Sequence, residues 1–213
     1  MERLETARSA EAHWQSVYLA KSDAELSWFQ DRPATSLALH ARIDPRPVRV
    51  LDVGGGQSAL VAALLDAGPE DSPGSISVLD IAPAAVERAK LRLGERSDRV
   101  RWIVGSVLEV DSLPSVDLWH DRAVLHFVTE PSDRRRYADR AAASVVAGGH
   151  AIVANFGPQG PERCSGLPVL RQSANEIATL FASSFDLIDQ AEESHLTPWG
   201  KPQQFVYSLL RRR

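Results

Sequence analysis

Two patterns of apolar positions alternate along this chain. Runs of aliphatic and β-branched residues are typical of strands buried in a parallel sheet, and apolar residues at every third or fourth position are typical of helices that cover one. The runs predict strands at 48–53, 75–81, 101–105, 116–121 and 150–156. The helical spacing predicts helices between them, at 58–67, 83–93 and 132–146.

The two ends of the chain depart from this alternation. Helical spacing covers about residues 4–20, and again 34–40, ahead of the first strand. Beyond the fifth strand lie an irregular loop rich in glycine and proline, 157–168, and a helix at 174–181. The segment 185–210 contains two strands around a Pro-Trp-Gly turn with no helix between them, which predicts an antiparallel pair.

Alternating strands and helices that end in a hairpin predict an α/β fold with a doubly wound, mostly parallel, seven-stranded Rossmann-like sheet. The hairpin closes this sheet at the C-terminus, and the N-terminal helices form a cap. At 213 residues, the length favours one domain over two. We therefore expect a single domain over 1–213, made of the cap (1–45), a cofactor-binding core (46–156) and a substrate-side loop, helix and hairpin (157–213).

Composition restricts the class of protein and its partners. Apolar residues make up 44% of the chain and charged residues 24%, which excludes a disordered or fibrous protein. With 24 basic against 28 acidic residues, the net charge of −4 gives no field that attracts nucleic acid. We expect no nucleic-acid partner and, because no apolar run is long enough to cross a bilayer, no membrane partner.

Cysteine and histidine content restricts the compartment and the metal chemistry. The one cysteine, Cys164, cannot form an intramolecular disulfide, which is typical of a reducing compartment. No Cys/His spacing resembles a zinc site, and the N-terminal segment is charged rather than apolar. We therefore expect a cytoplasmic protein without a metal.

The ends of the predicted strands carry the candidate chemistry, because ligands of open α/β sheets bind at the carboxyl ends of strands. The first strand runs into GGGQSA, which fits the G-x-G-x-x-A pattern of nucleotide-binding turns at Gly54, Gly56 and Ala59. Glycines at such a turn let a ligand approach the backbone closely. A tight turn ahead of a helix gives the same letters, so both interpretations stay open on this pattern alone.

Two acidic residues at neighbouring strand ends narrow the choice of ligand. Asp80 has the position of an acid that accepts hydrogen bonds from both ribose hydroxyls, or of an N-terminal acid of the next helix. Asp80 follows Asp52 by 28 residues, a long spacing that the polar insertion PEDSPGS (69–75) explains. Asp52 precedes the glycines, where a carboxylate repels a pyrophosphate and attracts an ammonium group. S-adenosylmethionine (SAM), which carries an amino-acid moiety, therefore fits better than a dinucleotide.

These segments together resemble the ordered motifs of class I SAM-dependent methyltransferases. The resemblance rests on VLDVGGGQSAL, VLDIAPAAVERAK, and GSVLEV ahead of VDLWHD, and it covers about residues 45–155. It implies SAM as cofactor and S-adenosylhomocysteine (SAH) as product. Ser106 stands where the family often has an acid, so a hydroxyl or a backbone carbonyl would bind the adenine amine. The implied contacts are backbone contacts from Gly54 and Gly56, ribose binding by Asp80, packing of Ile81 on the adenine, and adenine-edge contacts from Ser106 and Val107.

The N-terminal segment extends the resemblance. HWQSVY (13–18) and SWFQ (27–30) are similar to the aromatic lead-in of a methyltransferase-like subgroup that includes eukaryotic protein-lysine methyltransferases. By this similarity Trp14, Tyr18 and Trp28 cover the methionine end of the cofactor, where aromatic faces attract a sulfonium cation. The alternative is that these aromatic residues are core that packs a helix on the sheet edge.

The fourth strand runs into WHDRAVLHF (119–127), the densest group of functional side chains, and we expect it to line the acceptor pocket. Asp121 and His126 are the candidate general bases; the structural alternatives are an Asp–Arg pair and a buried, satisfied histidine. His120 and Arg122 are assigned to the cofactor site, where Arg122 would bind the cofactor carboxylate or a substrate anion.

Three further residues lie in segments that could reach the acceptor. Cys164 is expected to line the substrate site or to be incidental, since the methyl donor is the cofactor. His195 and Trp199, on the terminal hairpin, either reach the opening or belong to an ordinary turn.

The function we favour is methyl transfer from SAM to a small-molecule acceptor. A thiol or other soft nucleophile is preferred, because such a group needs neither a metal nor a dedicated base. The alternatives are a protein-lysine N-methyltransferase and a non-catalytic SAM-binding sensor or scaffold. The sequence does not predict the oligomeric state.

Overall fold

The computed structural model describes residues 2–68 and 72–213, with the side chains of the first helix described from residue 8 onward. The helices are α1 (Glu2–Ala20), α2 (Ala34–His40), α3 (Ala59–Leu65), α4 (Pro83–Leu93), α5 (Pro131–Ser144) and α6 (Ala174–Phe181), with short 3-10 turns η1 (Asp23–Glu25), η2 (Gly94–Arg99) and η3 (Leu125–Phe127). The strands are β1 (Arg49–Val53), β2 (Ser75–Asp80), β3 (Val100–Val104), β4 (Val116–Arg122), β5 (Val145–Phe156), β6 (Arg163–Cys164), β7 (Leu167–Pro168), β8 (Phe185–Leu196) and β9 (Pro202–Arg212).

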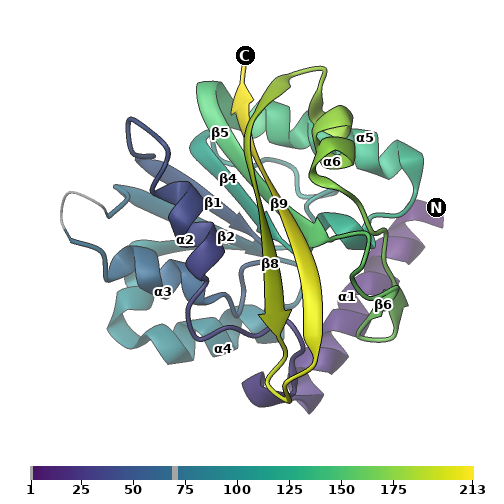
Figure 1. The fold of residues 1–213 in the computed structure, drawn as a ribbon. Helices are drawn as coiled ribbons and strands as arrows, with labels where there is room; N and C mark the ends of the chain where they lie inside the picture. Colours follow the sequence, from purple (N-terminus) through teal and green to yellow (C-terminus); the bar gives the residue numbers. More distant parts are fainter. Residues whose placement is uncertain (1, 69–71) are drawn as a thin grey trace.

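One seven-stranded sheet has the order β3-β2-β1-β4-β5-β9-β8 (Figure 1). Strands β1 to β5 are parallel, and β9 and β8 join them as an antiparallel pair. The strand order reverses between β1 and β4, and open α/β sheets bind ligands outside the carboxyl ends of strands at such a point. This topology confirms the predicted fold class.

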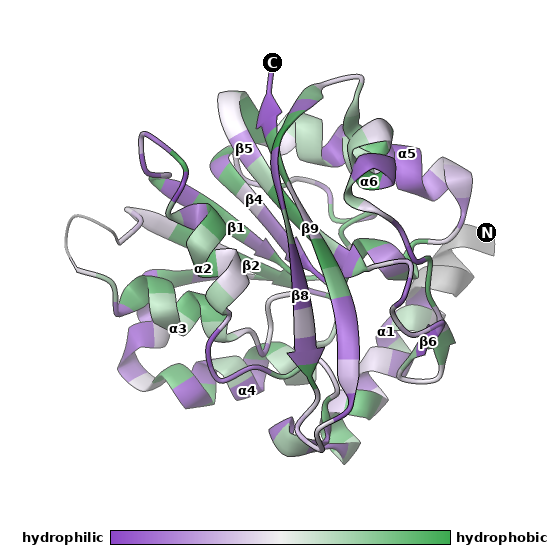
Figure 2. Ribbon diagram, in the orientation of Figure 1, coloured by the Kyte–Doolittle hydropathy of each residue, from purple (hydrophilic) through white to green (hydrophobic). Residues whose placement is uncertain are grey.

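Helices cover both faces of the sheet and fix its strand ends. Leu60 and Leu64 of α3 belong to the core on one face, and Tyr137 of α5 and Phe181 of α6 belong to the core on the other. Figure 2 shows hydrophobic residues concentrated in the strands and on α3, and hydrophilic residues prominent on α5. A fully buried aliphatic or aromatic side chain of this size contributes roughly 1.5–3 kcal/mol, so the two layers hold the strand ends firmly.

The N-terminal cap is anchored on α4. Val17 and Tyr18 of α1 pack with Ala84 and Ala85 of α4 in a separate apolar cluster. Arg88 of α4 donates hydrogen bonds from Nη1 to the carbonyl oxygens of Tyr18 and Lys21, both at 2.7 Å. These contacts hold α1 across the carboxyl ends of the strands.

The boundary between α5 and β5 differs from the predicted one. The sequence predicts a helix to residue 146 and a strand from 150, but α5 ends at Ser144 and β5 begins at Val145. Val145 pairs with Val116 of β4, and an irregularity in register follows before Leu118 pairs with His150. The β-branched side chain of Val145 suits a strand, and its partner in β4 is too distant in the sequence for local periodicity to reveal.

Two predicted loops have different outcomes. The segment 157–168, predicted to be irregular, contains a small hairpin in which Cys164 pairs with Leu167 across β6 and β7. In the polar insertion of 69–75, Pro69, Glu70 and Asp71 lie outside the described residues.

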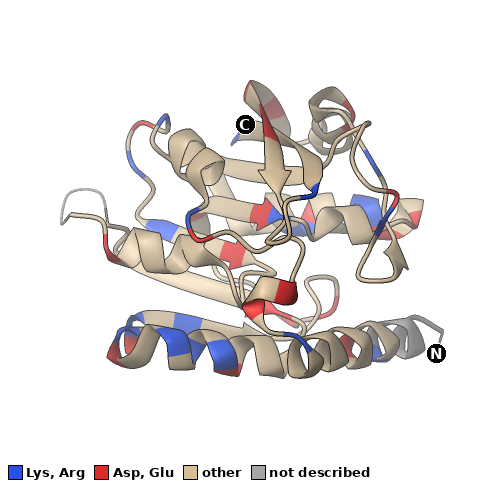
Figure 3. Cartoon of the chain, turned by 60° about the horizontal axis from the view of Figure 1, so that its bottom comes forward, with Lys and Arg blue, Asp and Glu red and all other residues tan. Residues whose placement is uncertain are grey.

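Two further features of the described chain are the distribution of its charged residues and the length of its apolar helices. Figure 3 shows acidic and basic residues intermixed over the helices and loops. No helix within residues 2–68 and 72–213 is long and apolar enough to cross a membrane.

Candidate functional site

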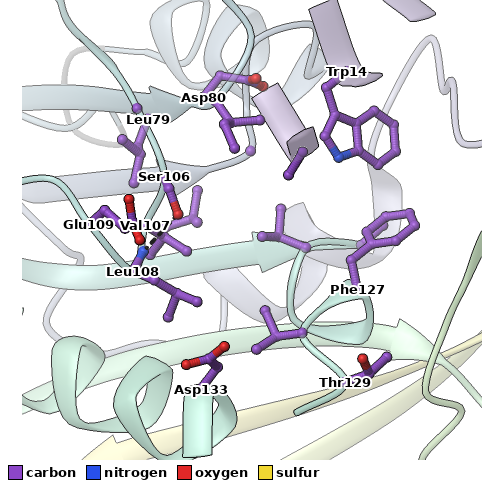
Figure 4. A pocket seen from close by; sticks show the side chains of 18 of the residues that line it. Trp14, Leu79, Asp80, Ser106, Val107, Leu108, Glu109, Phe127, Thr129 and Asp133 are labelled. Atoms are coloured by element: carbon purple, nitrogen blue, oxygen red, sulfur yellow. Dashed lines mark hydrogen bonds between the residues drawn. The ribbon is translucent and has the colours of Figure 1, made fainter. Parts of the chain in front are cut away.

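A cavity of about 510 Å³ lies at the carboxyl ends of the strands, where the order of the sheet reverses. Figure 4 shows its walls: Leu79, Asp80 and residues 106–109 on one side, Phe127, Thr129 and Asp133 on another, and Trp14 on a third. The strand ends, α1 and the start of α5 therefore line one cavity. Cavities of this volume are typical of small-molecule sites.

The glycine turn after β1 is packed tightly by the chain itself. Gly54 has a φ of +67°, a Cβ there would lie 2.1 Å from Val124 Cγ2, and its N–H donates to the Leu79 carbonyl at 2.7 Å. A Cβ on Gly56 would lie 2.6 Å from Ala85 Cβ. Gly54 lines the cavity, whereas Gly56 does not. The turn must be glycine for its backbone and close packing, whatever ligand it serves.

Asp80 faces the cavity from the end of β2. Its Oδ2 accepts from the N–H of Gly56 at 3.0 Å and its Oδ1 from the N–H of Ala82 at 2.8 Å. The residue is 4% exposed, and burial raises its pKa to about 6 against the opposing effect of these two hydrogen bonds. Asp80 thus joins the glycine turn to the start of α4, with Ile81 beside it in the cavity wall.

Ser106 and Val107 follow β3 and line the same cavity. The Ser106 hydroxyl accepts a hydrogen bond from the N–H of Leu108 at 3.2 Å, which fixes this turn locally. Glu109 lies next in the wall. The ends of β1, β2 and β3 therefore bring Gly54, Asp80 and Ser106 to one space.

Trp14, Tyr18 and Trp28 form an aromatic wall. The ring centroids of Trp14 and Trp28 are 5.7 Å apart, those of Tyr18 and Trp28 are 6.3 Å apart, and Trp14 also meets Phe127 at 4.9 Å. All three residues line the cavity, and they also pack with the α1–α4 cluster. The structure thus combines the two interpretations of this segment, a cavity wall and a packed core.

A second, smaller cavity of about 50 Å³ adjoins the first at the glycine turn. The two share Tyr18, Trp28, Val53, Gly54 and Arg122 in their walls. The small cavity is lined in addition by two buried polar side chains, Asp52 and His120.

Asp52 is 2% exposed and has one satisfied and one free oxygen. Oδ1 lies 2.7 Å from His120 Nδ1, and the buried Oδ2 has no hydrogen-bond partner. Both ring nitrogens of His120 are occupied, because Nε2 lies 2.9 Å from Ser36 Oγ. His120 therefore has no nitrogen left for a direct ligand contact, and the sequence-based assignment of His120 to the cofactor site requires it to act through Asp52.

Arg122 reaches both cavities with one nitrogen free. Nε donates to the hydroxyl of Tyr207 at 3.0 Å, and Nη1 donates to the carbonyl of Trp28 at 2.9 Å. The guanidinium group lies over the ring of Phe205. Nη2 is buried without a hydrogen-bond partner, with Glu193 Oε1 at 3.9 Å. Asp52 and Arg122 thus line the same small cavity, and each has one buried side-chain atom that makes no hydrogen bond.

Asp121 and His126 do not line either cavity. Asp121 is fully buried and accepts from the Tyr137 hydroxyl at 2.5 Å and from the N–H groups of Val124 and Leu125. Burial raises its pKa to about 6. His126 is also fully buried, and burial lowers its pKa to about 3, so it is neutral at pH 7. The structure leaves both predicted bases out of reach of an acceptor in the cavity.

Cys164, His195 and Trp199 have different positions relative to the site. Cys164 lines the large cavity at 5% exposure, 3.8 Å from Ser27 Oγ, and burial raises the pKa of its thiol. His195 Nε2 donates to the Ser27 carbonyl at 2.7 Å, and Trp199 is 55% exposed; neither lines a described cavity. Only the cysteine of the three reaches the site.

Several residues that line the cavity could not be predicted from the sequence. Phe127 was read as part of a dense motif without a role, and Ala10, Glu109 and Asp133 carry no local signal. Ser36 was also missed, since only the packing of α2 brings it to His120. No group of three His, Cys, Asp or Glu side chains that could hold a metal occurs in the described part of the chain.

Comparison with known proteins bears on this site. Residues 51–151 match the family described as "Methyltransferase domain". A curated relative, malonyl-[acyl-carrier protein] O-methyltransferase of Anoxybacillus flavithermus, is 32% identical over 94 residues, which are 44% of this chain and 34% of the relative. The chain therefore matches about a third of the length of that relative.

Solved structures are similar over most of the chain. The N-methyltransferase NodS from Bradyrhizobium japonicum, in complex with SAH, aligns with a TM-score of 0.71 at 14% identity over 93% of this chain and 96% of its own. The 1,6-didemethyltoxoflavin-N1-methyltransferase of Burkholderia thailandensis, with bound SAH, aligns with a TM-score of 0.65 at 24% identity over 96% of this chain and 84% of its own. Residues 51–151 therefore match a methyltransferase domain, and the chain has the fold of these solved methyltransferases.

Proposed function

We propose that this protein transfers the methyl group of SAM to a small-molecule acceptor. The observation that carries the proposal is the junction of the two cavities at the glycine turn, where Asp52 and Arg122 line one wall and each has a buried side-chain atom that makes no hydrogen bond. An α-amino acid moiety carries an ammonium and a carboxylate that would satisfy these atoms. A buried charged atom that makes no hydrogen bond is costly, which favours a ligand that supplies a donor to Asp52 Oδ2 and an acceptor to Arg122 Nη2.

The large cavity fits the rest of the cofactor. Asp80 would accept hydrogen bonds from the ribose hydroxyls, Ile81 would pack on the adenine, and the turn at Ser106 and Val107 would contact its edge. Gly54 would border the link between the two ends.

When bound, SAM supplies an electrophilic methyl group on a sulfonium. Trp14, Tyr18 and Trp28 would face that cation with their ring quadrupoles and exclude water from the reacting atoms. The chain's contribution is then alignment of the acceptor with the methyl group, which can supply a large part of the rate enhancement. Cys164 and Phe127 would line the acceptor side of this space.

A soft nucleophile fits this acceptor side best. Neither Asp121 nor His126 lines the cavity, and in its wall Trp14 contacts the rings of Tyr18, Trp28 and Phe127. A thiolate or a neutral amine attacks without losing a proton to an enzyme base. The similar proteins include O- and N-methyltransferases, so the acceptor atom has to be measured.

The test is transfer of label from methyl-labelled SAM, with thiols, amines, phenols and a cell lysate as acceptors. We expect label in at least one small molecule, with formation of SAH. Label that enters only lysate protein would support the protein-lysine alternative instead. Tight SAM binding without turnover for any acceptor would support the sensor or scaffold alternative.

A further inference from the structure

Ser36, His120 and Asp52 form a buried chain of hydrogen bonds beneath the glycine turn. Asp52 and His120 are direct register partners on β1 and β4, and Ser36 reaches them from α2. The two contacts measure 2.7 Å and 2.9 Å, and the three residues are 2%, 2% and 1% exposed. Three separate elements thus converge on one carboxylate.

The donors in this chain follow from the chemistry of its members. An ionised carboxylate can only accept, so His120 Nδ1 donates to Asp52 Oδ1. The hydroxyl of Ser36 both donates and accepts, and it satisfies Nε2 whichever way the proton lies. The contact with Ser36 therefore holds the ring in the orientation that directs Nδ1 at Asp52.

This arrangement has the order of a hydrolytic triad but not its accessibility. Ser36 lines neither cavity and is buried, so its hydroxyl meets no substrate. The hydrogen-bonded chain meets a cavity at its carboxylate end instead. Asp52 lines the small cavity, and its free Oδ2 lies against the glycine turn, where a Cβ on Gly55 would be 2.3 Å away.

We propose that Ser36 and His120 are positioning residues that hold Asp52 for the ammonium group of the cofactor's amino-acid moiety. The inference rests on the proposed function. His120 occupies Oδ1 and so fixes the torsion of the carboxylate, which leaves Oδ2 as the acceptor for the ligand. Without the imidazole, Oδ1 would be buried and unpaired, and the carboxylate would rotate or bind a proton.

The experiment compares two ligands of the intact protein by calorimetry. SAH contains the amino-acid moiety, and 5′-methylthioadenosine shares its adenosine and sulfur but lacks that moiety. His120→Leu removes the donor to Asp52, whereas His120→Asn keeps an N–H close to the position of Nδ1. Ser36→Ala removes the outer contact, and Ser144→Ala is the matched control, since Ser144 is a buried serine that donates to the Pro114 carbonyl away from both cavities.

We expect His120→Leu to weaken SAH binding by on the order of 10- to 100-fold and to leave the affinity for 5′-methylthioadenosine within about threefold. Ser36→Ala should act in the same direction, to a smaller extent. His120→Asn should recover most of the affinity for SAH, and Ser144→Ala should leave the ratio of the two affinities unchanged. If His120→Leu does not fold, the ratio in Ser36→Ala decides.

If His120→Leu weakens the binding of SAH and of 5′-methylthioadenosine equally, His120 has a structural role only, and the inference is overturned. Equal affinity of the wild type for the two ligands would overturn it as well, because Asp52 would then make no selective contact, while SAM binding would still stand. A wild type that binds neither ligand would contradict the proposed function itself.

Discussion

Burial and hydrogen bonding act on Asp80 in opposite directions. Burial disfavours the charged carboxylate and raises its pKa to about 6, and the N–H groups of Gly56 and Ala82 limit that rise. Ribose hydroxyls would donate to the same oxygens and stabilise the ionised form further. Ligand binding therefore favours the ionised form of Asp80, which the protein without ligand loses as the pH falls through about 6.

We expect the affinity for SAH to be constant above about pH 7 and to fall as the pH drops through about 6, because protonation of Asp80 removes an acceptor. Asp80→Asn should weaken binding at pH 7 by on the order of 10- to 100-fold and abolish this pH dependence. Calorimetry between about pH 5 and about pH 8 measures both effects. A wild-type affinity that does not change over this range would show that Asp80 does not bind the ligand.

Ala123 carries backbone strain at the edge of the cavity. Its φ is 75°, in the left-handed region that costs roughly 1–2 kcal/mol for a residue with a Cβ. Ala123→Gly should therefore leave the free energy of unfolding unchanged or raise it by up to about 1 kcal/mol. Denaturant unfolding of Ala154→Gly, at a buried strand position without positive φ, supplies the contrast, with an expected loss of about 1 kcal/mol or more. If Ala123→Gly and Ala154→Gly lower the free energy of unfolding equally, Ala123 is not strained.

The sequence predicted some of these residues and not others, for a physical reason. Asp52 and Asp80 stand at strand ends, where position along the chain already determines which edge of the sheet a side chain reaches. Asp121 and His126 also follow a strand end, but Tyr137 of α5 and the backbone of β5 enclose them. Such enclosure depends on long-range packing and leaves no local pattern.

At the scale of elements, runs and periodicity predicted every strand of the large sheet, and the errors lie at boundaries. The α5–β5 junction was misplaced because Val145 pairs with a strand far away in the sequence. The β6–β7 hairpin was missed because two-residue strands have no periodicity. Its position matters for the site, since it brings Cys164 into the cavity wall.

Helix α1 places Trp14 over the strand ends, and this element gives a spectroscopic prediction. Addition of SAH should change the tryptophan fluorescence of the wild type, because Trp14 and Trp28 line the cavity. Trp14→Phe should reduce the change, and Trp199→Phe should not, since Trp199 is an exposed turn residue outside the cavity. If the fluorescence change disappears in Trp199→Phe and persists in Trp14→Phe, the ligand binds outside this cavity.

The hairpin of β8 and β9 holds Arg122 through Tyr207. The Tyr207 hydroxyl accepts from Arg122 Nε at 3.0 Å and donates to Glu193, which also accepts from Gln30. Tyr207→Phe removes this anchor and keeps the buried ring. We expect it to weaken the binding of SAH by about tenfold and that of 5′-methylthioadenosine much less, because Arg122, the proposed partner of the SAH carboxylate, loses its anchor. An unchanged affinity for SAH would show that Arg122 needs no support from the hairpin.

At the scale of the whole molecule, the site is assembled from the N-terminal cap, the centre of the parallel sheet and the C-terminal hairpin. Asp52, Gly54 and Asp80 come from the sheet, Trp14 from the cap, and the hairpin anchors Arg122. The sheet order follows from the alternation of elements and the right-handed crossover rule. The way in which the cap lines the cavity and the hairpin anchors Arg122 does not, because it depends on contacts between distant segments.

The central claim is that the joined cavities hold SAM or SAH in one orientation, and a crystal structure of the protein with SAH tests it most directly. We predict that the ribose hydroxyls lie within hydrogen-bond distance of Asp80, the ammonium group at Asp52 Oδ2 and the carboxylate at Arg122 Nη2. The adenine should lie between Ile81 and the turn at Ser106. SAH bound elsewhere on the protein, or bound in the cavity with its amino-acid end away from Asp52 and Arg122, would contradict the account.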